Sequence, residues 1–65
     1  MKRYYDENAD IFWLVIKEGP QYDTEEVLPD VNLELGKDNE VIGVEILRAS
    51  RFGKDLKKIA EIVSQ

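Results

Sequence analysis

The sequence predicts a small α+β domain, in which an antiparallel β-meander of four to five strands packs against one C-terminal amphipathic helix. Two observations lead to this fold class. Short apolar segments with period-two alternation, separated by turn-forming clusters, continue as far as Leu47. After Ser50, apolar residues recur at helical spacing instead. With 65 residues, 43% of them hydrophobic, we expect a single domain over residues 1–65, with the meander in 1–48 and the helix in 50–65.

The first two expected strands form a β-hairpin. Lys2 to Tyr5 is short and aromatic, and the polar cluster from Asp6 to Asp10 is rich in turn-forming residues. The run from Ile11 to Ile16 is β-branched and aromatic and is too short for a typical helix. Its alternate positions carry Phe12, Leu14 and Ile16 on one face and Ile11, Trp13 and Val15 on the other. Because both faces are apolar, we expect a central strand that is covered on both sides.

Three further strands complete the predicted sheet. Thr24 to Leu28 has β propensity and ends before Pro29, which suits a strand end or an edge position. Val31 to Leu35 alternates apolar and polar residues and predicts a half-exposed strand. Val41 to Leu47 predicts the last strand, within which Gly43 leaves room for a close neighbour such as Trp13 or Tyr5.

The predicted helix follows Ala49 and Ser50. Its apolar stripe, at the spacing i, i+3, i+4 and i+7, consists of Leu56, Ile59, Ala60 and Val63. Either Ser50 or Gly53 caps the helix, and the choice between them stays open. Because about eleven helical residues are marginal in isolation, this helix needs to dock on the sheet.

The composition excludes several kinds of chemistry. The chain has no Cys and no His, which removes disulfides, thiolate metal sites and the most common metal ligand. We therefore expect no catalytic residues, no metal, no cofactor and no enzymatic activity. The longest apolar run has six residues and no signal-peptide pattern precedes it, so we expect a cytoplasmic protein that does not associate with membranes. Because a small domain without disulfides or a structural metal needs another source of stability, we expect a homo-oligomer or a small protein partner.

The net charge of −5 is unevenly distributed. Residues 1–45 carry 12 acidic and 4 basic residues, whereas residues 46–65 carry 2 acidic and 5 basic ones. The acidic part is either a solvated surface or a face that steers toward a basic protein partner. A weak basic patch consists of Arg48, Arg51, Lys54, Lys57 and Lys58. It is either a solvated helix surface or a contact for nucleic acid, and an acidic body makes nucleic acid the less expected partner.

The order of motifs resembles the domain of unknown function 2283 family over about residues 4–50. At the start, Tyr5-Asp6 and Ala9-Asp10 precede the alternating strand that begins at Ile11. In the middle, Glu26-Val27 and Pro29-Asp30-Val31 fit the family's central strands, although a glycine often stands at the position of Asp30. At the end, Val41 to Leu47 is followed by Ala49-Ser50.

The resemblance implies a small prokaryotic protein with a mainly antiparallel meander and a biochemical role that has not been established. Family members resemble one half of small two-gene modules that lie beside a toxin-like partner. The resemblance therefore implies an antitoxin-like role for this chain. The segment after Ser50 is an extension that many members lack or vary.

The main candidate for an interaction surface is the face that carries Ile11, Trp13 and Val15. Core packing under the helix explains these residues, and so does a dimer or partner interface, because large aromatic residues concentrate at binding hot spots. A cofactor pocket is a third explanation, and no glycine-rich phosphate loop supports it.

Acidic residues supply the other candidates. Asp6 and Asp10 either bind turn amides, with Tyr5 as their structural neighbour, or form a cation site or an acid/base pair. Glu45, beside Gly43, is either a buried general base, the partner of a cation such as Arg48, Arg3 or Lys2, or a cap at the N-terminus of the predicted helix. The alternative function is therefore a small-ligand or divalent-cation binding module that uses Asp6, Asp10 and Glu45.

Overall fold

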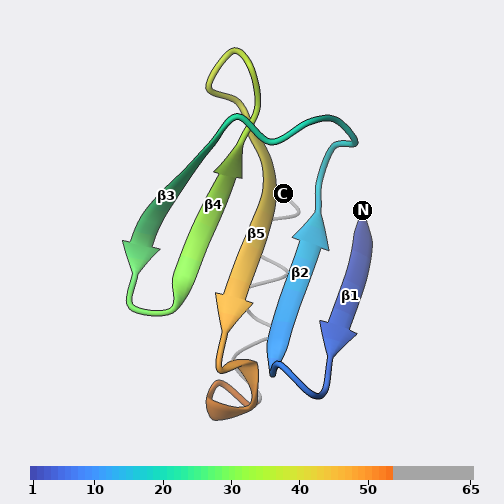
Figure 1. The fold of residues 1–65 in the computed structure, drawn as a ribbon, viewed down its shortest axis with the longest axis vertical. Helices are drawn as coiled ribbons and strands as arrows, with labels where there is room; N and C mark the ends of the chain where they lie inside the picture. The colour runs from blue at the N-terminus through green and yellow to red at the C-terminus, as the bar shows by residue number, and fades with distance from the viewer. Residues whose placement is uncertain (54–65) are drawn as a thin grey trace.

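A computed structural model describes residues 1–53, which form one five-stranded antiparallel sheet (Figure 1). All the strands expected from the alternation pattern are present. They are β1 (Lys2–Asp6), β2 (Ile11–Val15), β3 (Asp23–Leu28), β4 (Val31–Leu35) and β5 (Val41–Leu47). A single 3₁₀ turn, η1 (Ala49–Arg51), follows β5.

The strand order β1-β2-β5-β4-β3 joins a hairpin to a three-stranded meander. The two parts meet where β2 pairs with β5, so β5 is the central strand and β2 lies one place from an edge. In Figure 1 the connection between β2 and β3 crosses the upper end of the sheet. The central position of β5 agrees with its burial, because Ile42, Gly43, Val44 and Ile46 are all buried.

The register gives the sheet a core face and an opposite face. On the core face Leu14 lies opposite Val44, and Ile46 lies opposite both Phe12 and Val31. The buried cluster consists of Leu14, Val31, Val44, Ile46 and Ala49, with Phe12, Leu33 and Phe52 packed against it. The opposite face, called the Trp13 face below, carries Tyr4, Trp13, Val15, Asn32, Glu34 and Glu45 at register positions. Its side chains are half-buried or exposed.

The prediction of an α+β fold is wrong, because the described chain is all-β with no helix other than the 3₁₀ turn. Ser50 lies inside η1, whose N-cap residue is Arg48, and its N–H and hydroxyl donate to Asp10. Gly53 has a φ of 49°, the left-handed conformation that ends helical turns. The apolar stripe from Leu56 to Val63 lies outside the described residues.

Among residues 1–53, four non-glycine residues lie in the left-handed region: Asp10, Asp30, Asn39 and Arg48. Asp30, in the turn between β3 and β4, has a φ of 67°, which accounts for the glycine that often stands there in the family the chain resembles. The carbonyl of Asp30 accepts a hydrogen bond from the Leu47 N–H at 2.8 Å, which ties this turn to the end of β5. Arg48, directly after β5, has a φ of 49°.

Candidate functional site

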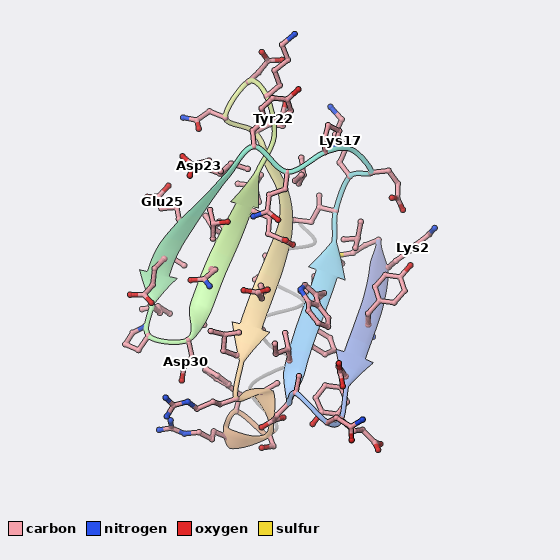
Figure 2. The ribbon with its side chains drawn as sticks, viewed as in Figure 1. Lys2, Lys17, Tyr22, Asp23, Glu25 and Asp30 are labelled. Atoms are coloured by element: carbon pink, nitrogen blue, oxygen red, sulfur yellow. The ribbon has the colours of Figure 1, made fainter. Side chains whose placement is uncertain are left out.

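A hollow of about 490 Å³ lies on the Trp13 face, between the sheet and the β2–β3 connection. The sheet contributes Tyr4 from β1, Trp13 and Val15 from β2, Glu34 from β4 and Ile42 from β5. The connection contributes Lys17, Glu18, Gly19 and Gln21. Figure 2 shows Lys17 on this connection, at the end of the sheet where the connection crosses. The hollow therefore combines two aromatic rings with charged groups of both signs.

Glu45 binds its neighbours on both sides within the sheet. The indole N–H of Trp13 donates to Glu45 Oε2 at 3.2 Å, and the Asn32 amide donates to Glu45 Oε1 at the same distance. Both donors lie directly opposite Glu45 in the register of β2 and β4. The carboxylate therefore holds the Trp13 ring against the sheet, with one protein donor on each of its oxygens.

Glu34 lies opposite Gly43, and the missing side chain of Gly43 makes room for its carboxylate. A Cβ atom built on Gly43 would lie 2.7 Å from Glu34 Oε1 and 3.0 Å from the Leu14 carbonyl oxygen. The close neighbour of Gly43 is therefore Glu34 together with the backbone of β2, rather than Trp13 or Tyr5. Burial of the carboxyl, reinforced by the charge of Glu45, raises the pKa of Glu34 above its ordinary value.

Asp6 serves the turn between β1 and β2. Its Oδ1 accepts hydrogen bonds from the N–H groups of Asn8 at 2.9 Å and Ala9 at 3.2 Å. These bonds form a local side-chain turn, in which a short carboxylate satisfies amides that no strand pairs.

Asp10 connects the same turn to η1, which is distant in sequence. Asp10 Oδ1 accepts from the Tyr5 hydroxyl at 2.7 Å and the Ser50 N–H at 2.9 Å, and Oδ2 accepts from the Ser50 hydroxyl at 2.6 Å. The hydrogen bonds from Ser50 and then Tyr5 lower the pKa of Asp10. The hydrogen bond that Tyr5 gives to Asp10 is the main cause that raises the pKa of Tyr5.

The three acids of the cation-site alternative do not come together as one group. Asp6 and Asp10 bind amides and hydroxyl groups around the first turn, whereas Glu45 binds Trp13 and Asn32. Within residues 1–53, no cluster of three or more metal-ligating side chains is present.

The described members of the basic patch lie beside an acid. Arg48 and Arg51 approach Asp30 Oδ2 at 3.8 and 3.7 Å. Lys54, Lys57 and Lys58 lie outside the described residues.

The three sequence-predicted interaction residues share one face of β2, but only two of them line the hollow. Trp13 and Val15 line the hollow, while Ile11 lies opposite Leu47, away from it. Sequence reasoning missed Tyr4, Asn32, Glu34 and the residues of the β2–β3 connection. The polar positions between Val31, Leu33 and Leu35 were the available signal, because strand alternation places Asn32 and Glu34 on the face opposite the core. Their proximity to Trp13 depends on the pairing of β4 with β5, which alternation does not reveal.

Comparison with known proteins identifies the family. No curated protein and no solved structure matches the chain. Within the part of the chain that the structure describes, no helix is long and apolar enough to cross a bilayer. Residues 2–50 match the family described as Protein of unknown function (DUF2283), a range that includes all five strands and every residue that lines the hollow. The chain therefore belongs to the DUF2283 family of proteins of unknown function.

Proposed function

We propose that this protein is a cytoplasmic, non-enzymatic and homodimeric interaction module that binds a basic protein partner through the Trp13 face. The observation that carries the proposal is the hollow that the half-buried Trp13 and Glu34 both line, with Glu45 bound to the N–H edge of the indole. Aromatic residues with an apolar body and a polar edge are the residue types that dominate binding hot spots.

The chemistry of the hollow suits a lysine or arginine side chain. A cation above an indole or phenol ring is attracted by the ring's negative face, and a nearby carboxylate adds an ionic contact. Glu34 offers that contact at a favourable place, because its raised pKa means that its charge is poorly stabilised in the free protein. A bound cation would stabilise the ionised form of Glu34 and would gain affinity from it.

The polar groups of the site support binding rather than catalysis. Both oxygens of Glu45 accept hydrogen bonds from Trp13 and Asn32, so this carboxylate is committed to holding the ring. Glu34 faces an open hollow, whereas a general base normally works in a site that excludes water.

The antitoxin-like role implied by the family resemblance is one form of this proposal. In that form, the basic partner is a toxin-like protein encoded beside this one. A second copy of the chain suits the Trp13 face less well than a basic protein does. Face-to-face pairing would bring Glu34 and Glu45 close to the same carboxylates of the other copy, and like charges at an interface are unfavourable.

A titration with an arginine-rich peptide tests the binding chemistry directly. Trp13 is the only tryptophan, so its fluorescence reports on the hollow without labelling. We expect a saturable fluorescence change and a dissociation constant that rises about tenfold in the Glu34→Gln variant, as for a loss of about 1.4 kcal/mol. The matched control is Glu25→Gln, which removes the same charge from β3 on the core-face side of the register. Equal effects of the two variants, or no change in fluorescence, would contradict the proposal.

Co-expression with the product of the neighbouring gene tests the biological partner. We expect a small basic protein to co-purify in a fixed ratio, and the Trp13→Phe and Glu34→Gln variants to recover less of it. Trp13→Phe keeps an aromatic ring but removes the N–H that binds Glu45. A partner that both variants retain in full would rule out the Trp13 face as its binding surface.

A further inference from the structure

We infer that the outer edge of β1 is the surface through which two copies of this chain pair, so that two sheets join into one continuous ten-stranded sheet. This inference rests on the homodimeric state included in the proposed function. It does not depend on the basic partner, because the dimer would pair through the backbone edge of β1, whereas the partner would bind Trp13 and Glu34; only the Tyr4 side chain borders both surfaces.

The sheet has two edge strands, β1 and β3, and each pairs with a single strand among the described residues. Figure 1 shows them at opposite sides of the sheet. An edge strand presents a row of backbone N–H and C=O groups that no neighbour satisfies, and such a row is a template for another strand. All five residues of β1 are exposed, and Tyr4 and Tyr5 retain 50% and 48% of their accessible surface.

The edge of β3 is protected against such pairing. Its register shifts between Glu26 and Leu28, and Pro29 follows directly. Asp23, Glu25 and Glu26 make the strand acidic with no basic residue to oppose them, and Figure 2 shows Asp23 and Glu25 along it. Bulges, prolines and like charges are the features by which natural sheets prevent edge-to-edge association. A second copy is therefore expected on β1 and not on β3.

The sequence of β1, Lys-Arg-Tyr-Tyr-Asp, is complementary to itself in an antiparallel pair. When Tyr4 lies opposite Tyr4 of the second copy, Lys2 lies opposite Asp6 at two symmetric places. In the same register, Arg3 lies opposite Tyr5 twice. Opposite charges, aromatic pairs and a cation beside a ring each stabilise directly opposed positions on a sheet. In this one register, every side chain of β1 therefore lies opposite a favourable partner.

The contacts already present leave these groups available. The ion pair between Lys2 and Glu18, at 3.3 Å, joins two strongly exposed side chains and is therefore weak. The turn amides bind Asp6 through Oδ1, and no other residue of the described chain donates to Oδ2. Lys2 can therefore reach Asp6 of the second copy without disrupting the turn.

The symmetry of this pairing closes the assembly. An isologous β1–β1 pair uses the exposed edge of both copies and leaves only the protected β3 edges, so the assembly stops at two chains. The twofold axis places both Trp13 faces on the same side of the joined sheet. The dimer would therefore present two hollows on one surface, separated by the two Tyr4 side chains.

Cysteine cross-linking tests the register. The chain has no cysteine, so Tyr4→Cys introduces the only thiol, and the proposed register places it opposite itself across the axis. The backbones of directly opposed residues in antiparallel strands are close enough for a disulfide. We expect mild oxidation to convert most of this variant to a covalent dimer. The controls Thr24→Cys, on the β3 edge, and Lys37→Cys, on the exposed β4–β5 turn, should remain largely monomeric in denaturing gels. Equal cross-linking of the three variants would overturn the proposal.

Sedimentation equilibrium of charge variants provides a second, independent test. We expect the wild-type protein to be dimeric at tens of micromolar. Lys2→Glu should raise the dimer dissociation constant at least about tenfold, because symmetry repeats each new like-charge pair. Adding Asp6→Asn to Lys2→Glu should recover part of the affinity, since Asn keeps an acceptor for the turn but removes the opposed charge. Lys37→Glu makes the same charge change away from β1 and should have no effect.

The outcomes distinguish a failure of the β1 interface from a failure of the homodimer itself. A strictly monomeric wild-type protein would overturn both the homodimer and this interface, while the fluorescence titration of the hollow would stand. A dimer that neither cross-links through Tyr4→Cys nor responds to Lys2→Glu would overturn the interface alone. Open-ended polymers would indicate pairing of the basic end of β1 with acidic β3, and would also overturn it. Circular dichroism checks that each variant keeps its sheet. If the Tyr4→Cys variant unfolds, the test of the interface rests on the Lys2→Glu result alone.

Discussion

At Glu34 the proposed binding role and the stability of the fold conflict. Its carboxylate lies over Gly43, and burial and the charge of Glu45 raise its pKa above the ordinary value of 4.5. Below that value the carboxyl is neutral in both the folded and the unfolded chain, so it has no electrostatic cost. As the pH rises through 4.5 the unfolded chain ionises first, and the folded state loses relative stability. At neutral pH Glu34 is therefore a mildly destabilising residue that a bound cation would compensate.

The first prediction follows from the direction of this pH dependence of stability. Glu34→Gln should raise the free energy of unfolding at pH 7 by about 0.5 kcal/mol, a value reduced for partial exposure to solvent. The difference from wild type should disappear below pH 4, where both side chains are neutral. Urea denaturation at several pH values measures this difference in the free energy of unfolding. A variant that is equally stabilised at pH 3 and pH 7 would show that charge is not the cause.

Arg48 provides the second prediction, because its backbone is in the left-handed region with a φ of 49°. Glycine adopts this conformation without the steric cost that a side chain incurs. We expect Arg48→Gly to raise the free energy of unfolding by about 0.5–1 kcal/mol. Arg51→Gly is the matched control, since Arg51 also approaches Asp30 but has no positive φ. The control should lower stability by about 0.5–1 kcal/mol, and thermal melts of the two variants should shift in opposite directions.

At the scale of elements, Asp10 joins the β1–β2 turn to η1. Its carboxylate binds Tyr5 in the hairpin and Ser50 after β5, and its carbonyl accepts from the Ala49 N–H at 2.9 Å. The hairpin and the meander are therefore connected at this end as well as through the β2–β5 pair. Because the ionised carboxylate is the form that accepts these bonds, folding lowers its pKa.

The third prediction concerns this connection. Asp10→Asn should lower the melting temperature by a few degrees at pH 6–7, since a neutral acceptor binds the hydroxyl and amide donors more weakly. The stabilisation by Asp10 is present above its ordinary pKa of 3.8 and is lost as the pH falls through the lowered value. The difference from wild type should therefore shrink in acid. Asp38→Asn, on the exposed β4–β5 turn, is the control and should have little effect at any pH.

For the whole molecule, stability depends on a core on one face that both parts of the topology share. Leu14 from the hairpin and Val44, Ile46 and Val31 from the meander belong to one buried cluster. Leu14 is fully buried, whereas its neighbour Val15 is half-buried on the Trp13 face. The two faces of β2 therefore contribute unequally to folding.

The fourth prediction compares the two faces of β2. Leu14→Ala should lower the free energy of unfolding by about 3 kcal/mol, a large fraction of the roughly 5 kcal/mol available to a small domain. Val15→Ala should cost about 1 kcal/mol, because its side chain is only half-buried. Urea denaturation followed by Trp13 fluorescence and by circular dichroism measures both losses. Equal losses would show that the core is not confined to one face.

The strands and their facing residues could be predicted from the sequence, but the assembly of the strands could not. Alternation identified Val31 to Leu35 and Val41 to Leu47 because side-chain direction in a strand repeats every two residues. The order β1-β2-β5-β4-β3 could not be predicted, since hydrogen bonding between β2 and β5 joins segments about thirty residues apart without a local signal. The α+β prediction was wrong for the described residues, where Ser50 lies inside the 3₁₀ turn η1 and donates to Asp10, a contact with a residue far away in sequence that no local pattern reveals.

The candidate site divides in the same way. Trp13 and Val15 were identified from the sequence, because a strand that is apolar on both faces has more apolar surface than one core can cover. Glu34 and Tyr4 were missed, and Glu45 was identified without its partners. Their association with Trp13 depends on the register between four strands, which only backbone pairing sets.

The sequence by itself determined where the strands lie, which side chains share a face, the acidic charge and the absence of Cys and His chemistry. These are local or additive properties, so they can be read along the chain. Only the tertiary structure decided that Glu45 binds Trp13, that Gly43 makes room for Glu34 and that Asp10 reaches Ser50. Those contacts join residues that are distant in sequence, and their geometry exists only after the strands have paired.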